Sequence, residues 1–299
     1  MLKYRRKEKG VALIMVLMIV AIMTVVVTST IYKNRLLIKE AELQKNHAKG
    51  SLIIKTVKAD LIQVLTTTPT WVVGPTKKLK DKYQLPKDMN FYGTSFKYHD
   101  LNVKIQDLSG LVSLYPFDED GFLLLLKSMG IKSKERNILL DSIKDWQDSD
   151  HFKRLNGAEK QDYLNSSLPR NGTIQVIDEV LLIKGMTSEI WDKISPYIVL
   201  FGRGGISTQY IPDDRLDIFG SDFDQKNIIE KRKALRENGE NPTAIMYGGE
   251  LTYPGRRLLI TISMPYQESQ YTESFVIVRT RGMNVPYVIA DNIVGTYEN

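Results

Sequence analysis

Acidic side chains gathered in one short stretch of the sequence are the residues best suited to chemistry. Residues 145–151 read DWQDSDH, and a further acid follows the Gly-Ala pair at 157–158. A hard cation such as calcium binds six to eight oxygen atoms, and carboxylates at alternate loop positions can converge on one ion. The alternative is a solvated acidic helix end that binds nothing. The primary candidate ligands are Asp148, Asp150 and Glu159, and the secondary ones are Asp145 and Asp162.

Other kinds of reactive site find little support. The chain has no cysteine, and its three histidines (His47, His99 and His151) fall in three different regions, so a zinc site of His and Cys ligands is not expected. The sequence lacks the common motifs of serine hydrolases, P-loop enzymes, zinc proteases and dinucleotide-binding enzymes. Acidic pairs near 118–120 and 213–217 are better explained as surface loops than as a glycosidase pair. The sequence therefore predicts a protein that is not an enzyme.

The N-terminal segment sets the topology. Five cations in residues 1–9 precede Gly10, and residues 11–27 are apolar except for Thr24. About 20 such residues span a bilayer, and the preceding cations keep the N-terminus in the cytoplasm. We therefore expect residues 11–31 to cross a membrane and the rest to lie outside the cytoplasm. The small residues 28–30 are followed by Ile-Tyr-Lys, which makes a poor secretory cleavage site.

Two interpretations of this segment remain open. One is an uncleaved anchor; the other is a leader, residues 1–10, that is removed after Gly10. The Lys-Gly-Val-Ala-Leu-Ile junction resembles that of type IV pilins and pseudopilins. The resemblance implies cleavage between Gly10 and Val11 by a prepilin peptidase that also methylates the new N-terminus. Members of that family usually carry Glu at the fifth mature position, where this chain has Met15, and its absence resembles the K-type minor pseudopilins of type II secretion systems.

Charge and composition fit an exported protein. The 299 residues are 42% hydrophobic, which suffices for one large or two modest domains. The net charge of +6 falls to +2 without the leader, because residues 1–10 hold five cations and one acid. A basic surface for nucleic acid is therefore not expected.

The apolar segment continues as an amphipathic helix to about residue 67. Apolar residues recur at helical spacing over 31–67, and Gly50 is interpreted as a loosened turn within the helix. A helix of about 50 residues would be roughly 75 Å long. We expect residues 11–66 to form a spine like that of a pilin. The alternative is an anchor helix followed by an unrelated helix.

The remaining sequence alternates between strand-like and helical blocks. Residues 68–78 indicate a turn-rich exit from the spine. Because late strands need early partners, we expect an α+β fold with an antiparallel sheet and an inserted all-helical domain. The domains would be residues 67–115 (first part of the head), 116–200 (insert) and 201–299 (second part of the head). Residues 95–105 are expected to form a strand or a hairpin, and the other expected strands are 111–114, 257–263, 274–280 and 285–290. The expected helices are 118–129, 133–148, 177–183 and 188–194.

Two glycine turns mark the insert. Gly130 and Gly185 each follow a helix end, where glycine adopts the left-handed conformation without strain, and Ser133 and Thr187 are candidate N-caps. The pair resembles helix-hairpin-helix (SAM-like) units, which often bind the DNA backbone. A compact packing module is the favoured interpretation, because neither turn is followed by a strongly basic helix.

The acidic stretch extends the resemblance. Its D-W-x-D-x-D and G-A-E segments are similar to those of the K-type pseudopilins, in which this region binds calcium, although residues 160–163 depart from the family pattern. The resemblance implies a minor pseudopilin that initiates or caps the periplasmic pseudopilus. Its partners would be other minor pseudopilins, the prepilin peptidase/N-methyltransferase and the inner membrane, which it would cross once. The alternative is an envelope protein crossing the membrane once, with a periplasmic head that binds a ligand or DNA.

Overall fold

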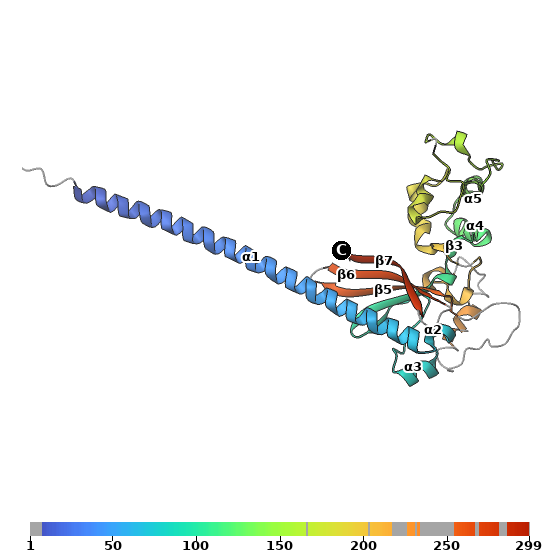
Figure 1. The fold of residues 1–299 in the computed structure, drawn as a ribbon, viewed down its shortest axis with the longest axis horizontal. Helices are drawn as coiled ribbons and strands as arrows, with labels where there is room; N and C mark the ends of the chain where they lie inside the picture. Colours follow the sequence, from blue (N-terminus) through green and yellow to red (C-terminus); the bar gives the residue numbers. More distant parts are fainter. Residues whose placement is uncertain are drawn as a thin grey trace, which may run out of the picture. The chain divides into compact units, whose positions relative to one another are not determined.

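A single long helix, α1 (Glu8–Thr67), begins the computed structural model and contains 60 residues (Figure 1). From Val11 onward it includes a stretch long and apolar enough to cross a membrane, with a mean hydropathy of 3.0. The helix runs without interruption through Gly50, as expected. It therefore confirms the spine as one element rather than two unrelated helices.

The structure describes residues 8–165, 167–202, 204–216, 226–230, 232–233, 254–266, 269–280 and 286–298. Residues 1–7 of the expected leader lie outside this set. The chain divides into two compact units, Met1–Thr56 and Val57–Asn299. The second unit holds the last turns of α1 and every element that follows.

An antiparallel sheet of five strands forms the head, in the order β1-β2-β5-β6-β7. Early and late parts of the sequence meet in its centre, where Val103 of β2 pairs with Ile262 of β5. This pairing confirms that the head is discontinuous in sequence. The strands are β1 (Phe96–Tyr98), β2 (Leu101–Asp107), β5 (Arg257–Tyr266), β6 (Ser269–Arg279) and β7 (Tyr287–Glu298).

The last turns of α1 pack on this sheet. Val57, Leu61 and Leu65 recur at helical spacing and are buried, as are the alternate side chains of β5 that face one side of the sheet. Lys58 pairs with Glu273 of β6 at 2.7 Å, and both side chains are nearly buried. The last turns of the spine thus have their apolar face covered by the sheet, whereas Leu37 and Leu52, which belong to the predicted apolar face, are exposed.

The segment after α1 differs from the expected turn-rich exit. It contains two short helices, α2 (Thr70–Val73) and α3 (Lys77–Tyr83). Trp71 is buried and anchors the first, while the Thr76 hydroxyl caps the second by accepting a hydrogen bond from the Leu79 amide. Pro and Gly at close spacing hide helices this short from a periodicity search.

Helices with a core of their own occupy the middle of the chain, between β3 and β4. Val112 and Leu114 of β3 belong to the same buried cluster as Phe122, Ile143 and Ile190. The strands are β3 (Val112–Tyr115) and β4 (Ile198–Phe201), and the helices are α4 (Glu119–Ser128), α5 (Ser133–Gln147) and α6 (Ser188–Ile194). Among the described residues, the 3-10 turns are η1 (Leu108–Gly110), η2 (Lys160–Asp162), η3 (Ile177–Leu182), η4 (Ser195–Tyr197), η5 (Thr208–Tyr210) and η6 (Asp213–Arg215). The α+β class with an inserted helical segment is therefore confirmed.

Details of the insert refine the expected boundaries. Gly130 and Gly185 have positive φ angles of 73° and 90°, as their positions after helices require. Thr187 caps α6 through the Ile190 amide, but the predicted cap at Ser133 is wrong, because Lys132 stands at that position without a side-chain bond. Residues 177–182, expected as an ordinary helix, form the 3-10 turn η3.

The chain leaves the head after Ser109 and returns to it at Ser207, and we call the place where these two crossings meet the neck. β3 and β4 pair there in parallel, and the Ser207 amide donates to the Ser109 carbonyl at 2.7 Å. Gly110 lies so close to Tyr210 that an added Cβ would stand 2.0 Å from the Tyr210 carbonyl oxygen. The two crossings between head and insert therefore touch through their backbones.

Candidate metal centre

The C-terminal end of α5 positions the acidic loop. Leu139, Ile143 and Trp146 lie on the buried face of this helix, so the residues after it leave the core at a fixed place. The Trp146 ring meets the ring of Tyr163 at 5.9 Å, edge to face. Asp148 is the C-cap, and its amide still donates to the Lys144 carbonyl at 3.0 Å. The loop thus begins on a rigid support.

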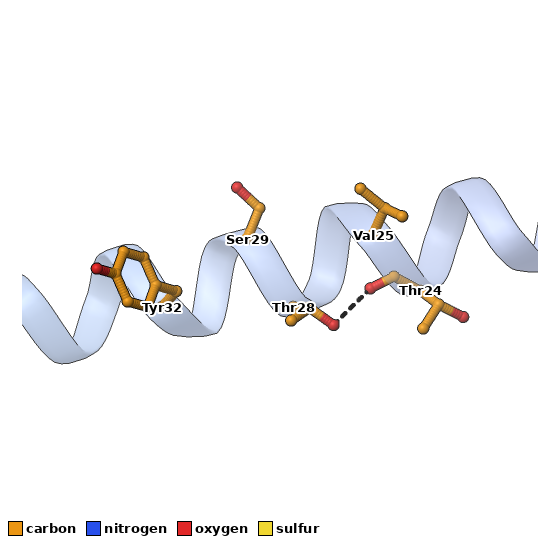
Figure 2. Close-up of a pocket in the computed structure, with 5 residues that line it drawn as sticks. All are labelled: Thr24, Val25, Thr28, Ser29 and Tyr32. Atoms are coloured by element: carbon orange, nitrogen blue, oxygen red, sulfur yellow. Dashed lines mark hydrogen bonds between the residues drawn. The ribbon is translucent and has the colours of Figure 1, made fainter.

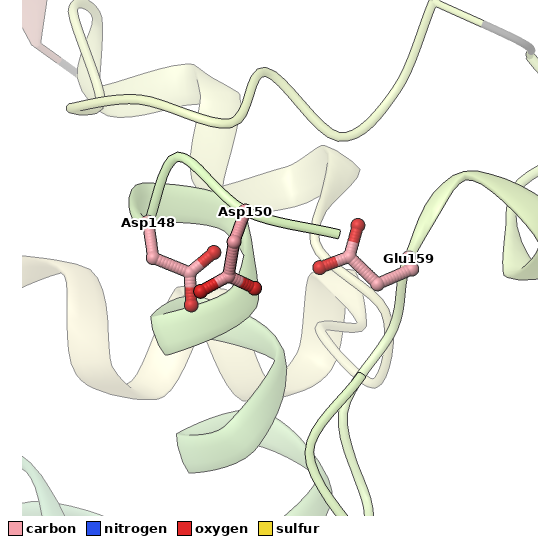
Figure 3. Close-up of side chains that lie close together, drawn as sticks. All are labelled: Asp148, Asp150 and Glu159. Carbon is pink, nitrogen blue, oxygen red and sulfur yellow. The ribbon is translucent and has the colours of Figure 1, made fainter. Parts of the chain in front are cut away.

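Three of the candidate ligands lie together. Asp148, Asp150 and Glu159 each offer an oxygen, and these oxygens lie within 4.8 Å of one another. Figure 3 shows Asp148 and Asp150 on the loop after α5, with Glu159 facing them from another stretch of the chain. We call these three side chains the carboxylate group. Such a set of hard oxygen donors from separate loop positions suits calcium.

Glu159 is the least satisfied member of the group. It is 1% exposed, and neither of its carboxylate oxygens has a hydrogen-bond partner among the described residues. Oδ1 of Asp148 is likewise buried and without a partner there. Burial and the nearby charges of Asp145 and Asp148 raise the pKa of the Glu159 carboxyl. A buried acid without a donor is costly, so the group favours a bound cation or a proton.

Asp145 belongs to the loop framework rather than to the carboxylate group. Its side chain is fully buried and accepts from the Ala158 amide at 2.9 Å and from the Arg154 Nη1 at 2.6 Å. Gly157 lies against it, because an added Cβ would stand 1.9 Å from the Asp145 Oδ2. Asp145 therefore shapes the loop from 154 to 158 with both of its oxygens already engaged.

Asp162 also lies outside the carboxylate group. Its Oδ1 accepts from the Nζ of Lys153 at 2.7 Å and of Lys184 at 3.0 Å, and its Oδ2 accepts from the Glu159 amide at 3.1 Å. The bond from Lys153, with the help of Lys184, lowers the pKa of Asp162 to about 2. The charge of this secondary candidate is already balanced by lysine.

Arg154 is the site residue that the sequence did not reveal. Its guanidinium pairs with Asp145 and Asp148, and this contact with Asp148 raises the already high pKa of the arginine further. The only sequence signal was a base placed between two groups of acids. Asn171 is a second such residue, since its Nδ2 donates to the Asp150 carbonyl at 2.7 Å and lies 2.7 Å from the His151 Nδ1.

The other predicted functional residues lie in α1. The helix begins at Glu8 and includes Gly10 and Val11, and the side chain of Met15 is exposed. The hydroxyls of Thr24, Thr28 and Thr30 bond to backbone carbonyls of the same helix, four residues earlier. Figure 2 shows Thr28 on one face with Thr24, and its hydroxyl donates to the Thr24 carbonyl at 2.8 Å. Such satisfaction is what a helix inside a bilayer requires.

The family comparison matches the middle of the chain. Residues 100–203 match the family model described as Type II secretion system (T2SS), protein K. That range contains the end of the β1–β2 hairpin, the inserted helices and the whole acidic loop.

Relatives match over a longer range. The type II secretion system protein K of Klebsiella pneumoniae is 24% identical over 247 residues, which cover 77% of this chain and 75% of the relative. The putative type II secretion system protein K of Escherichia coli K12 is 22% identical over 281 residues, covering 85% of this chain and 83% of the relative. Both matches span most of each chain.

A solved structure supports the fold. The crystal structure of the GspK-GspI-GspJ complex from the type 2 secretion system of enterotoxigenic Escherichia coli includes a chain that matches with a TM-score of 0.54 and 14% identity. The match covers 86% of this chain and 99% of that one. At this identity the likeness concerns the arrangement of the elements.

Proposed function

We infer from its similarity to the type II secretion system protein K family that this chain is a minor pseudopilin, a structural subunit of the pseudopilus without catalytic activity of its own. The observation that carries this function is the family match over residues 100–203, which contain the inserted helices and the acidic loop. The long apolar helix and the antiparallel head agree with it. The alternative, an envelope protein that binds DNA through its glycine turns, is not favoured.

We propose further that the subunit initiates or caps the pseudopilus. Met15 puts a thioether where a pilin subunit usually has a carboxylate, so this helix offers nothing to pair with the terminal amine of a neighbour. A neighbour's glutamate would still reach the amine of Val11. The insert adds bulk to the head that would obstruct a further subunit. Such a subunit has one usable axial interface, which suits an end position.

The proposed location follows from α1. The helix would cross the bacterial inner membrane once, with the N-terminus in the cytoplasm and the head in the periplasm. The prepilin peptidase would cleave after Gly10 and methylate the amine of Val11. The other minor pseudopilins would then be its direct partners, by analogy with the structurally similar complex, in which GspK, GspI and GspJ occur together.

We also propose that the carboxylate group binds calcium. Asp148, Asp150 and Glu159 would supply side-chain oxygens, and the two orphaned oxygens of Glu159 support this assignment. The ion would add positive charge where the loop has an excess of negative charge, and would tie residues 148–150 to residue 159. Its role would be structural.

Association measurements test the function. A head fragment lacking the membrane-spanning residues should form a small complex with the other minor pseudopilins of the same secretion system, measured by size-exclusion chromatography with light scattering. Alone, it should not polymerise, because the spine interface is missing. Pseudopilus filaments that contain this chain along their whole length would contradict the end position.

A further inference from the structure

Arg154 lies in an unusual place for a base, inside the acidic loop. Its Nη1 is 2.6 Å from the Asp145 Oδ1 and forms a second, shorter contact with the Asp148 Oδ2. The backbone amide of the same residue also donates to Asp145, at 3.2 Å from its Oδ2. Side chain and main chain together hold Arg154 against the end of α5.

The charges around Arg154 are unbalanced without a metal ion. Asp145 and the three members of the carboxylate group bring four acids into one loop. In the part of the chain that the structure describes, Arg154 is the base that forms ion pairs within this set, whereas the neighbouring Lys153 pairs with Asp162. One guanidinium thus offsets part of the repulsion among four carboxyls.

The two oxygens of Asp148 have different roles. Oδ2 pairs with Arg154, while Oδ1 is buried without a partner among the described residues, and an Asp148 oxygen lies within 4.8 Å of oxygens from Asp150 and Glu159. Arg154 therefore pairs with one oxygen of Asp148 and leaves the other without a described partner.

We propose that Arg154 is a built-in counter-ion of the calcium site, which keeps the acidic loop folded when calcium is absent and lowers the affinity for calcium. This inference rests on the proposed calcium site. The guanidinium stabilises the ion-free loop by neutralising Asp145 and Asp148. Its positive charge also repels an incoming divalent cation, because the two would share the carboxylate of Asp148.

The consequence of Arg154 is a smaller difference in stability between the calcium-free and the calcium-bound protein. Without Arg154, the ion-free loop would lose its fixed cation and the ion would meet a more negative site. The calcium Kd should then tighten by about tenfold, the size expected for removing one charge next to a divalent ion in a partly solvated site. A residue that only packs the loop would produce the opposite, since its loss would weaken binding.

The experiment compares Arg154→Gln with Lys153→Gln in the full chain purified in detergent. Lys153 is the matched control, because it is the adjacent base in the same loop but pairs with Asp162. Titration calorimetry with calcium chloride gives the Kd, and thermal melting is recorded in chelator and in saturating calcium. We expect Arg154→Gln to melt earlier in chelator, to regain most of that loss in calcium and to bind calcium about tenfold tighter. Lys153→Gln should keep the wild-type Kd within about twofold.

The outcomes separate this inference from the calcium site itself. If the wild-type chain binds no calcium, both proposals fail. If it binds calcium and Arg154→Gln binds equally or more weakly, only the role of Arg154 is overturned. Should Arg154→Gln not fold, Arg154→Lys decides, because it keeps the charge with fewer donors. Its Kd should stay near the wild-type value while its melting temperature in chelator falls, and a Kd changed by about tenfold would overturn the role.

Discussion

Glu159 has two carboxylate oxygens without a described hydrogen-bond partner, and what compensates them distinguishes two states of the acidic loop. A buried carboxylate without a donor must be compensated by a proton or by a cation. The proton is available at low pH, and a divalent ion would serve at neutral pH. The charge on Glu159 thus connects the order of the loop to what is bound there.

Replacing a member of the carboxylate group should remove the dependence of the loop's stability on calcium. We expect Asp148→Ala to lower the melting temperature in calcium and to abolish most of the further loss that a chelator causes in the wild type. An ion at 100 times its Kd stabilises a fold by about 2.7 kcal/mol, so the lost increment should be of that order. Thermal melting with calcium or chelator measures it.

The exposed Asp178 in η3 provides the control for that measurement. Asp178→Ala removes an acid from the same insert but not from the carboxylate group, and should leave the calcium effect unchanged. An equal calcium effect in wild type and Asp148→Ala would show that the three acids are only a solvated helix end.

Asp107 is the second buried acid with a measurable consequence. It accepts from the amides of Ser109 and Gly255, and burial raises its pKa from 3.8 to about 6 although Arg279 acts in the opposite direction. Because the folded-state pKa lies above the unfolded one, this group favours folding at low pH. That contribution is lost as the pH rises from about 4 to about 6.

Asp107→Asn should therefore flatten the decline of stability across this pH window. The side-chain amide of the variant has a single acceptor oxygen and cannot accept from both backbone donors, so we also expect a loss of about 1–3 kcal/mol at pH 5. Urea unfolding at several pH values gives both quantities. An unchanged pH slope would mean that Asp107 does not titrate in this range.

The sequence predicted the acids of the site but not their roles. Alternating acids after a helix were visible, whereas the amide of Ala158 that satisfies Asp145 and the lysines that satisfy Asp162 come from residues brought together only by folding. Arg154 was missed for the same reason. Spacing shows which side chains have oxygens; it does not show which oxygens are already bonded.

At the scale of elements, backbone contact at the neck determines what substitutions the fold accepts. Gly110 ends η1, and an added Cβ there would overlap the Tyr210 carbonyl. Neither partner is a mobile side chain, so the strain cannot be relieved by a rotamer change.

Gly110→Ala should consequently destabilise the head by about 1–3 kcal/mol or more. Gly204→Ala is the control, since among the described residues its added Cβ would meet Pro116 at an ordinary 3.7 Å. Chemical unfolding of both variants makes the comparison, and equal stabilities would mean that the neck moves apart without cost.

Long, periodic elements were the predictable part of the fold. The spine, the helices α4 and α5 and the long strands β5 and β6 have enough residues for their hydrophobic pattern to be recognised. The short helices α2 and α3 are fixed by the buried Trp71 and the Thr76 cap instead. These interactions depend on the rest of the head and leave no periodic signal.

At the scale of the whole molecule, the start of the mature chain decides between an anchor and a pilin-like spine. If the leader is removed after Gly10, mass spectrometry of the protein from its native membrane should find Val11 as the first residue, with a methylated amine. Gly10→Val should block the cleavage and leave the leader attached, because the glycine before the cleavage site would be missing. An intact Met1 in the wild type, or a start near Ile31, would contradict the proposed pseudopilin processing.

The neck has a consequence for how such a protein can diversify. One backbone hydrogen bond joins Ser109 to Ser207, so the segment between these two serines leaves the head and returns to it at nearly the same point. The strand order of the sheet therefore does not depend on the length or sequence of the segment inserted between these two serines. Closing a longer loop costs only about 0.6 kcal/mol for each doubling of its length. An insert of different size or ligand preference could replace this one at the junction without changing the strand order of the sheet.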